Sequence, residues 1–387
     1  MKNILIAIRS IFKKGRHNVM KIVSLGIGLA VGLVLIAKVY FEQSYDDFYP
    51  DRDRVYQVWA KYQQNGGELK DYPQTSGGIA PTMQQQIPEI ETVTRYTSFG
   101  DWTFTMTDTK MKYSGRCIIA DSCFFDILPR PMLIGNAKEV LSTPMYVLIS
   151  SRIAKNIGGD VIGKNFTGRT MTIGGVFEEV PENSHSRYDV IVSMASAGRF
   201  MWEGSPTNML GNDRYISYVK LHKGVNPLAL EEQVRTFVNS YFPPEEQQKV
   251  GLSIDFSFHK LDNLHKELPQ VKRMTWILSL LAFALIFTAV MNYILIVISS
   301  IVNRSKEVAV HKCYGASENN IHGMMFGEAL VHIVLSLILA LLLILAFRGT
   351  VEELLATSLD SLLLSNGSLV LLGICILVFF VSGFMPG

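Results

Sequence analysis

Residues 304–321 have the sequence RSKEVAVHKCYGASENNI, a short, charged, glycine-broken stretch between two long apolar runs. The run before it, 274–301, contains no Asp, Glu, Lys or Arg. The run after it, about 325–347, carries Glu328 and His332 as its ionisable side chains. Roughly 20 apolar residues at ~1.5 Å each match a hydrocarbon core of ~30 Å. The sequence therefore predicts two membrane-spanning helices joined by a loop at one membrane face.

The charges in this stretch indicate its side of the membrane. Arg304, Lys306 and Lys312 concentrate positive charge there, and loops rich in Lys and Arg stay in the cytoplasm. Glu328 and His332, one helical turn apart, could form a proton relay, but a hydrogen bond or a salt bridge to the preceding loop fits their place near the inner interface better. A secondary transporter needs more buried polarity than this. If the protein moves anything, the energy must come from a partner.

Composition places the chain among integral membrane proteins with a substantial soluble part. Of its 387 residues 48% are hydrophobic, and the formal net charge is +2. No basic face with interleaved aromatic residues points to nucleic acid as a partner. Four cysteines are too few and too scattered for a disulfide framework. Only Cys117 and Cys123 fall together on the outer side of the predicted membrane, where two unpaired thiols are favoured and a bridge stays open.

The amino terminus predicts one interfacial helix and one spanning helix. In residues 1–18, apolar and basic residues fall largely on opposite helical faces, as in helices that lie on an anionic inner leaflet. These residues could instead begin a cleaved signal peptide. However, the apolar run that follows is long and no cleavage site precedes residue 45, so we expect a retained helix over 19–41. The first 21 residues carry Lys and Arg but no acid, which puts this terminus in the cytoplasm.

Two features of the first spanning helix suggest how it packs. Gly26, Gly28 and Gly32 offer a face for close helix packing. Lys21 and Lys38 are placed so that each can extend to one of the two membrane interfaces.

Residues 42–271 then lie outside the cytoplasm, as a large α/β (α+β) domain inserted between the first and second spanning helices. Alternating apolar and polar residues predict strands, and helical spacing predicts short helices between them. The expected helices are 80–86, one ending at 157 and 228–241, and the expected strands are 51–59, 92–97, 103–107, 112–120, 146–149, 171–177, 187–193, 215–221 and 252–258. Ser150 or Ser151 could cap the second helix, which Gly158 ends. This alternation favours mixed sheets.

Three further crossings complete the expected fold, an α-helical membrane protein with four transmembrane helices. The second crossing, with a stalk at its outer end, occupies 272–301, and a cytoplasmic coupling loop or helix follows at 302–324. The third crossing is 325–347, and an outer loop with three acidic residues spans 348–368. The fourth crossing is 369–386.

Signatures of catalysis are weak. GGDVIGKN at 158–165 nearly matches a phosphate-binding loop, but Asn165 stands where Ser or Thr must reach Mg²⁺, so we expect its glycines to make turns. The eight histidines show no metal-ligand spacing, and we expect His185, His259 and His265 to be surface or hydrogen-bonding residues. We therefore expect no enzyme activity, metal or cofactor in this chain, although a dispersed catalytic triad stays open.

The charged stretch resembles the signature of the MacB/FtsX-like family of ABC-transporter permeases. There, a basic residue, Glu, a small apolar pattern, Lys, Gly-Ala-Ser and a later Glu follow the second membrane helix. The outer domain resembles the family's periplasmic core domain in DRDRVYQV (51–58), SSRIAKNIGGDVIGKNF (150–166) and GGVFEEVPENSHSRYDV (174–190). The chain departs from the signature at His311 and Cys313–Tyr314. The matching positions are Arg304, Glu307, Val308, Val310, Lys312, Gly315, Ala316, Ser317, Ile321 and Glu328.

The resemblance implies a location in the bacterial inner membrane and a separate cytoplasmic ABC ATPase that binds the ATP. It also implies a homodimer or a fused second half, a periplasmic adaptor as a further partner, and an outer domain of two lobes, about 42–98 with 213–271 and 99–212. The residues that would couple to the ATPase are Arg304, Lys306, Glu307, Val308, Lys312, Gly315, Ala316, Ser317, Ile321 and Glu328.

The implied function is transmission of ATP-driven motion to the outer domain, for export or extraction of a drug, a peptide or a lipoprotein. Family members with a similar outer domain often carry the whole unit twice, and GFMPG at 383–387 resembles the end of their first repeat. We therefore expect an amino-terminal half rather than a four-helix subunit. The alternatives are a membrane-anchored extracytoplasmic sensor or regulator of a cell-envelope partner, and a membrane-tethered enzyme.

Overall fold

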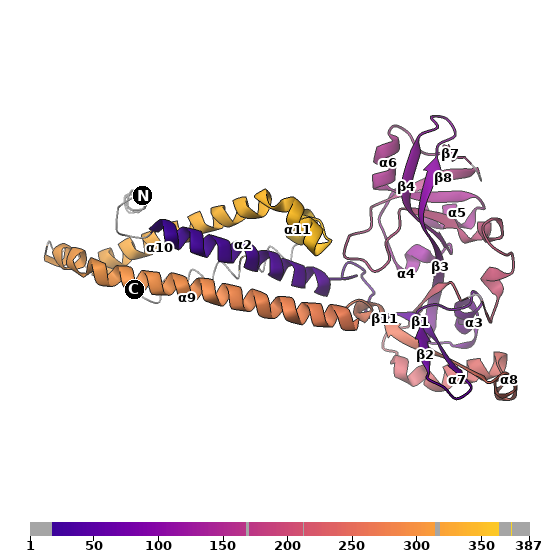
Figure 1. The fold of residues 1–387 in the computed structure, drawn as a ribbon. Helices are drawn as coiled ribbons and strands as arrows, with labels where there is room; N and C mark the ends of the chain where they lie inside the picture. The colour runs from indigo at the N-terminus through magenta and orange to yellow at the C-terminus, as the bar shows by residue number, and fades with distance from the viewer. Residues whose placement is uncertain (1–17, 168–169, 212, 314–317, 364–372, 374–387) are drawn as a thin grey trace. The chain divides into compact units, whose positions relative to one another are not determined.

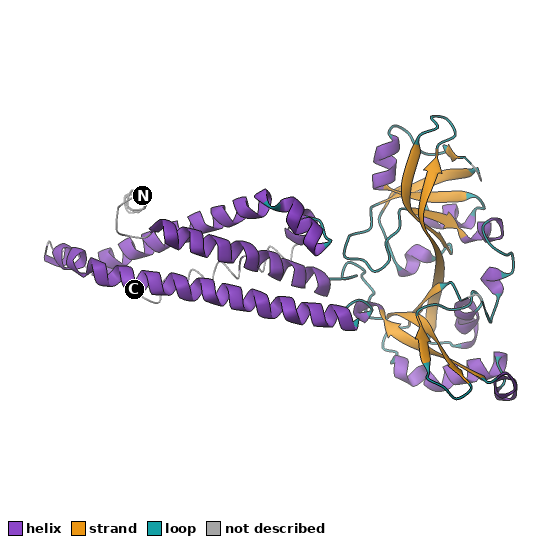
Figure 2. Cartoon of the chain, viewed as in Figure 1, coloured by secondary structure: helices purple, strands orange, loops and turns teal. Residues whose placement is uncertain are grey.

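The computed structural model describes residues 18–167, 170–211, 213–313, 318–363 and Gly373. The chain divides into two compact units (Figure 1, Figure 2). The helix unit consists of Met1–Ser44 and Glu267–Gly387, and the α/β unit consists of Tyr45–Lys266.

The described part of the helix unit holds three long helices and two short ones. They are α2 (Asn18–Gln43), α9 (Pro269–Cys313), α10 (Glu318–Ala346), α11 (Arg348–Leu355) and α12 (Leu359–Leu363). Within the described residues, Val19–Gln43 and Pro269–Asn292 are each long and apolar enough to cross a membrane. Leu330–Ala346 and Arg348–Leu355 add a third candidate span if this pair, bent by 69°, counts as one.

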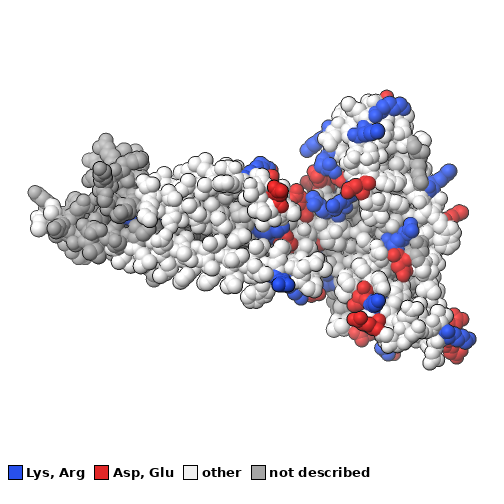
Figure 3. All heavy atoms as spheres, viewed as in Figure 1, with Lys and Arg blue, Asp and Glu red and all other residues white. Residues whose placement is uncertain are grey.

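These helices agree in part with the four expected crossings. The first and second are present as long apolar helices, and the third corresponds to α10. The fourth, 369–386, lies outside the described residues apart from Gly373, and the interfacial helix at 1–18 lies outside them apart from Asn18. The region expected to be an outer loop, 348–368, contains α11 and α12. Figure 3 shows that most of the described surface of the helix unit on this face is uncharged, as contact with hydrocarbon requires.

Of the loop or helix expected at 302–324, the structure shows a helix as far as Cys313. Helix α9 continues for 45 residues without interruption and includes this part of the charged stretch. Residues 302–313 contain no Gly or Pro, and their Glu, Lys, Arg and Ala are strong helix formers, so charge alone does not end the helix. Residues 314–317 lie outside the described part, and α10 begins at Glu318.

The glycines of α2 pack against both neighbouring helices, as predicted. A Cβ added at Gly26 would lie 2.9 Å from Leu339 Cδ2 of α10, and one added at Gly32 would lie 2.6 Å from Ile286 Cγ1 of α9. A Cβ at Gly28 would collide with Ala289 of α9. The missing side chains therefore let α2 approach α9 and α10 closely.

The lysines of α2, which the sequence predicted to extend to the two membrane interfaces, are both buried. Lys21 is 3% exposed and Lys38 is 6% exposed, so both are buried within the helix unit. Lys38 instead bonds to Glu42 and to Thr357, a residue far away in the sequence.

The α/β unit is built on one mixed sheet, with eleven strands among the described residues. Nine follow the order β11-β1-β10-β3-β4-β9-β6-β8-β5, while β2 pairs with β1 and β7 pairs with β8. The pairs β4–β9 and β6–β8 are parallel and the other pairs are antiparallel, which confirms the mixed sheet. The strands are β1 (Val55–Gln64), β2 (Lys70–Tyr72), β3 (Ile90–Thr105), β4 (Lys112–Ala120), β5 (Met132–Ile134), β6 (Tyr146–Ser150), β7 (Asn165–Phe166), β8 (Met171–Phe177), β9 (Val190–Ser193), β10 (Ile216–Leu221) and β11 (Leu252–Lys260).

Short helices pack against this sheet and build its cores. Helices α3 (Ile79–Gln86) and α7 (Glu231–Tyr241) pack on the core beside β1 and β10. This core includes Val58, Met83, Val219, Phe237 and Phe256. The helices of this unit are α3 (Ile79–Gln86), α4 (Phe124–Ile127), α5 (Ala137–Ser142), α6 (Ser151–Ile157), α7 (Glu231–Tyr241) and α8 (Pro244–Val250), with the 3₁₀ turns η1 (Met194–Arg199), η2 (Ser205–Thr207), η3 (Pro227–Leu230) and η4 (Leu261–Asn263).

A middle core draws residues from both predicted lobes. Tyr96 and Tyr218 belong to the first lobe, and Phe124 and Phe177 to the second, yet all four lie in one cluster. One sheet therefore runs through both lobes, and the boundaries between them stay a prediction.

Strand β3 differs most from expectation, because the sequence predicted two strands at 92–97 and 103–107. The strand is continuous for 16 residues, and its pairing with β4 shifts register between Ser98 and Gly100. Gly100 has φ of +70°, a conformation that glycine adopts readily and that lets a strand bulge without ending.

Other local predictions are confirmed. Ser150 caps α6, because its side chain accepts a hydrogen bond from Ile153 N, and the helix ends at Gly158 with φ of +74°. Cys117 and Cys123 are free, so the bridge that the sequence left open does not form. Burial raises the pKa of the Cys117 thiol to about 12.

Candidate functional site

The residues predicted to couple to an ATPase lie near the junction of α9 and α10. Gly315, Ala316 and Ser317 lie outside the described residues. The remaining seven are on the last turns of α9 or the first turns of α10: Arg304, Lys306, Glu307, Val308, Lys312, Ile321 and Glu328. We call residues 302–324 the coupling segment. Within it, Val310 is 54% exposed and the Cys313 side chain is exposed as well.

Helix α9 connects this segment to the α/β unit along the chain. It begins at Pro269, shortly after the last residue of the α/β unit, and ends at Cys313. At ~1.5 Å per residue its 45 residues extend for roughly 67 Å. An uninterrupted helix of this kind can carry a displacement from one end to the other.

The two chain ends of the α/β unit are fastened to each other. The rings of Tyr45 and His265 stack with centroids 3.4 Å apart. Lys266 Nζ lies 3.4 Å from Asp47 Oδ1 and 2.9 Å from Asp262 Oδ1. The segments that enter from α2 and leave toward α9 are therefore tied together inside this unit.

A buried polar cluster fixes the entering segment to the sheet. The Asp46 carboxylate accepts hydrogen bonds from Ser184 Oγ at 3.0 Å, from His185 N at 3.3 Å and from His185 Nδ1 at 2.7 Å. His185 Nε2 lies 2.5 Å from the Tyr218 hydroxyl on β10, and Ser186 Oγ lies 2.6 Å from the Tyr96 hydroxyl on β3. We call these six residues the Asp46 cluster.

The electrostatics of the cluster define its hydrogen bonds. Burial raises the pKa of Tyr96 to about 12 and holds the pKa of Tyr218 well above its usual value, so both phenols stay protonated. The two ring nitrogens of His185 thus join Asp46, through Nδ1, to the Tyr218 hydroxyl, through Nε2. The sequence predicted that His185 is a surface or a hydrogen-bonding residue, and the hydrogen-bonding role is confirmed.

This cluster contains Ser, His and Asp but is not arranged as an open catalytic site. Ser186 is 3% exposed, and its hydroxyl already lies within hydrogen-bond distance of Tyr96. Among the described residues, no group of three or more His, Cys, Asp or Glu side chains is placed to hold a metal ion. The arrangement can hold backbone segments together.

A second buried polar group lies in the helix unit. Lys38 Nζ is 2.6 Å from Glu42 Oε1, one turn along α2, and donates a hydrogen bond to Thr357 Oγ1 at 2.7 Å. All three residues are buried. We call this group the Lys38 clamp. The position of Lys38 in an apolar helix is the sequence feature that points to it.

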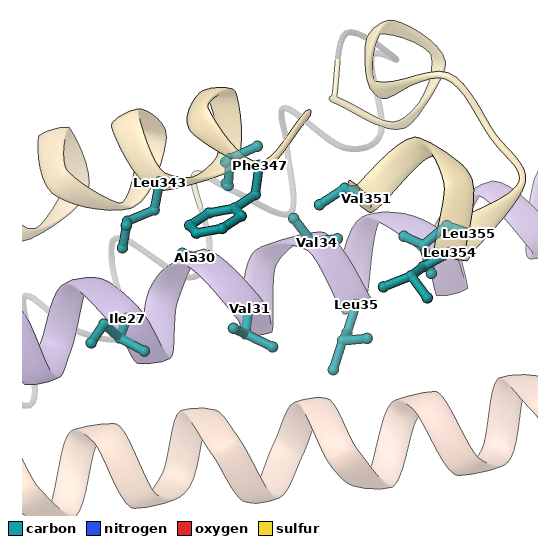
Figure 4. Close-up of a pocket in the computed structure, with 11 residues that line it drawn as sticks. Ile27, Ala30, Val31, Val34, Leu35, Leu343, Phe347, Val351, Leu354 and Leu355 are labelled. Atoms are coloured by element: carbon teal, nitrogen blue, oxygen red, sulfur yellow. The ribbon is translucent and has the colours of Figure 1, made fainter. Parts of the chain in front are cut away.

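An apolar cavity of about 470 Å³ lies between α2, α10 and α11 (Figure 4). Its lining is entirely hydrophobic and includes Val31 and Val34 of α2, Leu343 and Phe347 near the end of α10, and Leu354 of α11. The described side chains therefore pack loosely where α10 bends into α11.

Comparison with protein families gives two matches that together cover most of the chain. Residues 20–237 match the MacB-like periplasmic core domain, and residues 279–386 match the FtsX-like permease C-terminal domain. The first match alone spans more than half of the sequence. No curated protein matches the chain.

Solved structures resemble parts of the chain. A domain of a Porphyromonas gingivalis protein described as a permease is 32% identical, with a TM-score of 0.50, and the match covers 55% of this chain and 91% of that one. The periplasmic region of MacB from Actinobacillus actinomycetemcomitans is 15% identical, with a TM-score of 0.35 and coverage of 55% and 91%. The extracellular domain of the ABC-type transporter YknZ from Gram-positive bacteria is 11% identical, with a TM-score of 0.36 and coverage of 52% and 98%.

Proposed function

Because the chain belongs to the family of FtsX-like permeases with a MacB-like periplasmic core domain, we propose that it transmits ATP-driven motion from a separate ATPase to its α/β unit. Members of this family are permease components of ABC transporters, and their ATPase is a separate subunit. The coupling segment faces the cytoplasm and the ATPase, while the α/β unit lies on the other side of the membrane. The amino terminus is cytoplasmic, and the membrane is the bacterial inner membrane.

The observation that carries this proposal is the continuous course of α9. Its last turns hold Arg304, Glu307 and Lys312, which match the family signature, and its first residue follows the α/β unit closely. A displacement of the coupling segment by an ATPase would therefore reach the α/β unit through one helix rather than through flexible chain. The joined ends of the α/β unit would pass the same displacement to the segment that follows α2.

This motion drives the export or extraction of a drug, a peptide or a lipoprotein. The permease works as a homodimer or with a fused second half. A periplasmic adaptor is a further proposed partner.

Charge reversal in the coupling segment tests the proposal. The full-length chain is purified from its own bacterium in mild detergent, and the ATPase that accompanies it is assayed in nanodiscs. Glu307→Arg should abolish both co-purification of the ATPase and stimulation of its activity. Glu353→Arg is the matched control, because Glu353 is exposed on α11, and it should leave both unchanged. Full stimulation in the Glu307→Arg variant contradicts the proposal.

A further inference from the structure

The Lys38 clamp joins α2 to the turn between α11 and α12. The Thr357 hydroxyl donates its proton to Leu355 O at 2.9 Å, which leaves its lone pairs to accept from Lys38 Nζ. Ala356, with φ of +48°, ends α11 and places Thr357 at this turn. Lys38 also lies 5.1 Å from the centroid of the Phe41 ring. The ammonium group of Lys38 is thus held from several sides.

The segment at the other side of the clamp is itself braced. Arg348 Nε lies 2.9 Å from Glu352 Oε1, and Arg348 Nη2 lies 3.1 Å from Asp360 Oδ2. Glu352 Oε1 also accepts a hydrogen bond from Leu359 N at 2.9 Å. Leu362 is fully buried. Side-chain contacts therefore join α11 to the start of α12.

Stability alone is a poor reason for an ion pair at this place. Burying two charges costs free energy that their attraction repays only in part, and well-packed apolar residues often stabilise such a site as well or better. Among the described side chains, apolar packing is also incomplete nearby, where the cavity lies between α2, α10 and α11. A directional polar contact fixes the relative position of two helices where loose packing does not.

We propose that the Lys38 clamp is part of a second mechanical link between the coupling segment and the α/β unit, in addition to α9. Helix α10 begins within the coupling segment and ends at the braced pair α11–α12. The clamp fastens this pair to the last turns of α2, and α2 ends at Gln43, directly before the α/β unit. This inference rests on the proposed function, since it names a second route for the same motion. Lys38, Glu42 and Thr357 act here as positioning residues.

Thr357→Val is the most selective variant. It removes only the hydroxyl group that joins the turn between α11 and α12 to α2, and it leaves the Lys38–Glu42 pair inside α2 intact. Thr357→Ser keeps the hydroxyl and is the matched control. A second variant, Lys38→Met with Glu42→Leu, removes both charges of the pair together.

The measurement is the change in distance between spin labels at Leu354 and Met111 when ATP is added. The full chain, freed of its other cysteines, is assayed in nanodiscs with its ATPase. Both label positions are exposed, at 78% and 59%. In wild type and Thr357→Ser, ATP shifts the distance. In Thr357→Val and the Lys38→Met/Glu42→Leu variant, we expect less than half of that shift, while the stimulated ATPase rate stays within twofold of wild type.

The outcomes separate the inference from the function on which it rests. A full distance shift in Thr357→Val, or a full shift in the double variant, shows that the clamp is only structural and overturns the inference. If ATP shifts no distance and stimulates no ATPase in wild type, the proposed function itself fails. If Thr357→Val does not fold, the double variant decides by the same criterion.

Discussion

Replacing Asp46 by glycine tests whether the Asp46 cluster holds the entry of the α/β unit together. The carboxylate accepts hydrogen bonds from Ser184 Oγ, His185 N and His185 Nδ1, and Asp46 is fully buried. Each buried donor left without an acceptor costs about 1–3 kcal/mol. Ser184 Oγ can donate to Ser186 O instead, at 3.1 Å, so the two His185 donors are the ones that lose their acceptor. We therefore expect a loss of roughly 3–5 kcal/mol in the free energy of unfolding.

Glycine is the substitution that isolates the hydrogen bonds. Asp46 has φ of +60°, so a residue with a Cβ is strained there by about 1–2 kcal/mol, which glycine recovers. The greater freedom of glycine in the unfolded chain costs about 0.5–1 kcal/mol, which largely offsets this gain. The remaining effect is the loss of the carboxylate.

The assay is thermal unfolding of a fragment spanning 42–271, followed by circular dichroism. The related Porphyromonas gingivalis structure is of a single domain, which supports the use of such a fragment. Unfolding temperatures of domains this large shift by about 2–4 °C per kcal/mol, so Asp46→Gly should lower the Tm by roughly 6–20 °C. Lys110→Gly is the control, because Lys110 has φ of +56° and is exposed. A fall below about 2 °C, or an equal fall in the control, would refute the reasoning.

Three further predictions concern packing, capping and thiol chemistry. Gly28→Val should overpack α2 against Ala289 and cost about 1–3 kcal/mol, which should lower the midpoint of heat-induced aggregation in detergent. Gly349 has open space around it, so Gly349→Val should not lower this midpoint. Equal midpoints for the two variants would contradict the close packing at Gly28. Ser150→Ala removes the α6 cap and should lower the free energy of unfolding of the fragment in urea by about 1 kcal/mol. Ser253→Ala, at an exposed serine, is the control, and equal free energies for the two variants would exclude a capping role. Cys117 should resist alkylation at pH 8, because burial raises its pKa to about 12. Exposed Cys313 should react with a membrane-impermeant maleimide in inside-out vesicles and not in spheroplasts. The reverse pattern for Cys313 would place it on the opposite side of the membrane.

The sequence predicted those parts of the fold that depend on local patterns. Alternation located β1, β8 and β11, and a serine before an apolar helical pattern located the start of α6. Prediction failed where a local signal had two meanings. The sequence predicted separate strands at 92–97 and 103–107, although β3 continues through a bulge at Gly100. It also left 302–324 open as a loop or a helix, although α9 continues as far as Cys313.

The polar clusters could not be predicted because their partners are distant in the chain. Lys38 and Thr357 are separated by 319 positions, and Asp46 and His185 by 139. A lysine in an apolar helix is consistent with an extended side chain at an interface as well as with a buried pair, and only the fold decides between them. The coupling segment, in contrast, was recognised through a signature of neighbouring residues.

Site-specific photo-crosslinking at Val310 shows whether an ATPase docks at the coupling segment. Val310 lies in the coupling segment and is 54% exposed, and Trp276, near the opposite end of α9, is 78% exposed and serves as the control position. In intact cells, we expect a photo-reactive residue at 310 to capture a nucleotide-hydrolysing subunit and one at 276 not to capture it. Capture of that subunit at 276 alone, or at neither position, would contradict docking of an ATPase at the coupling segment.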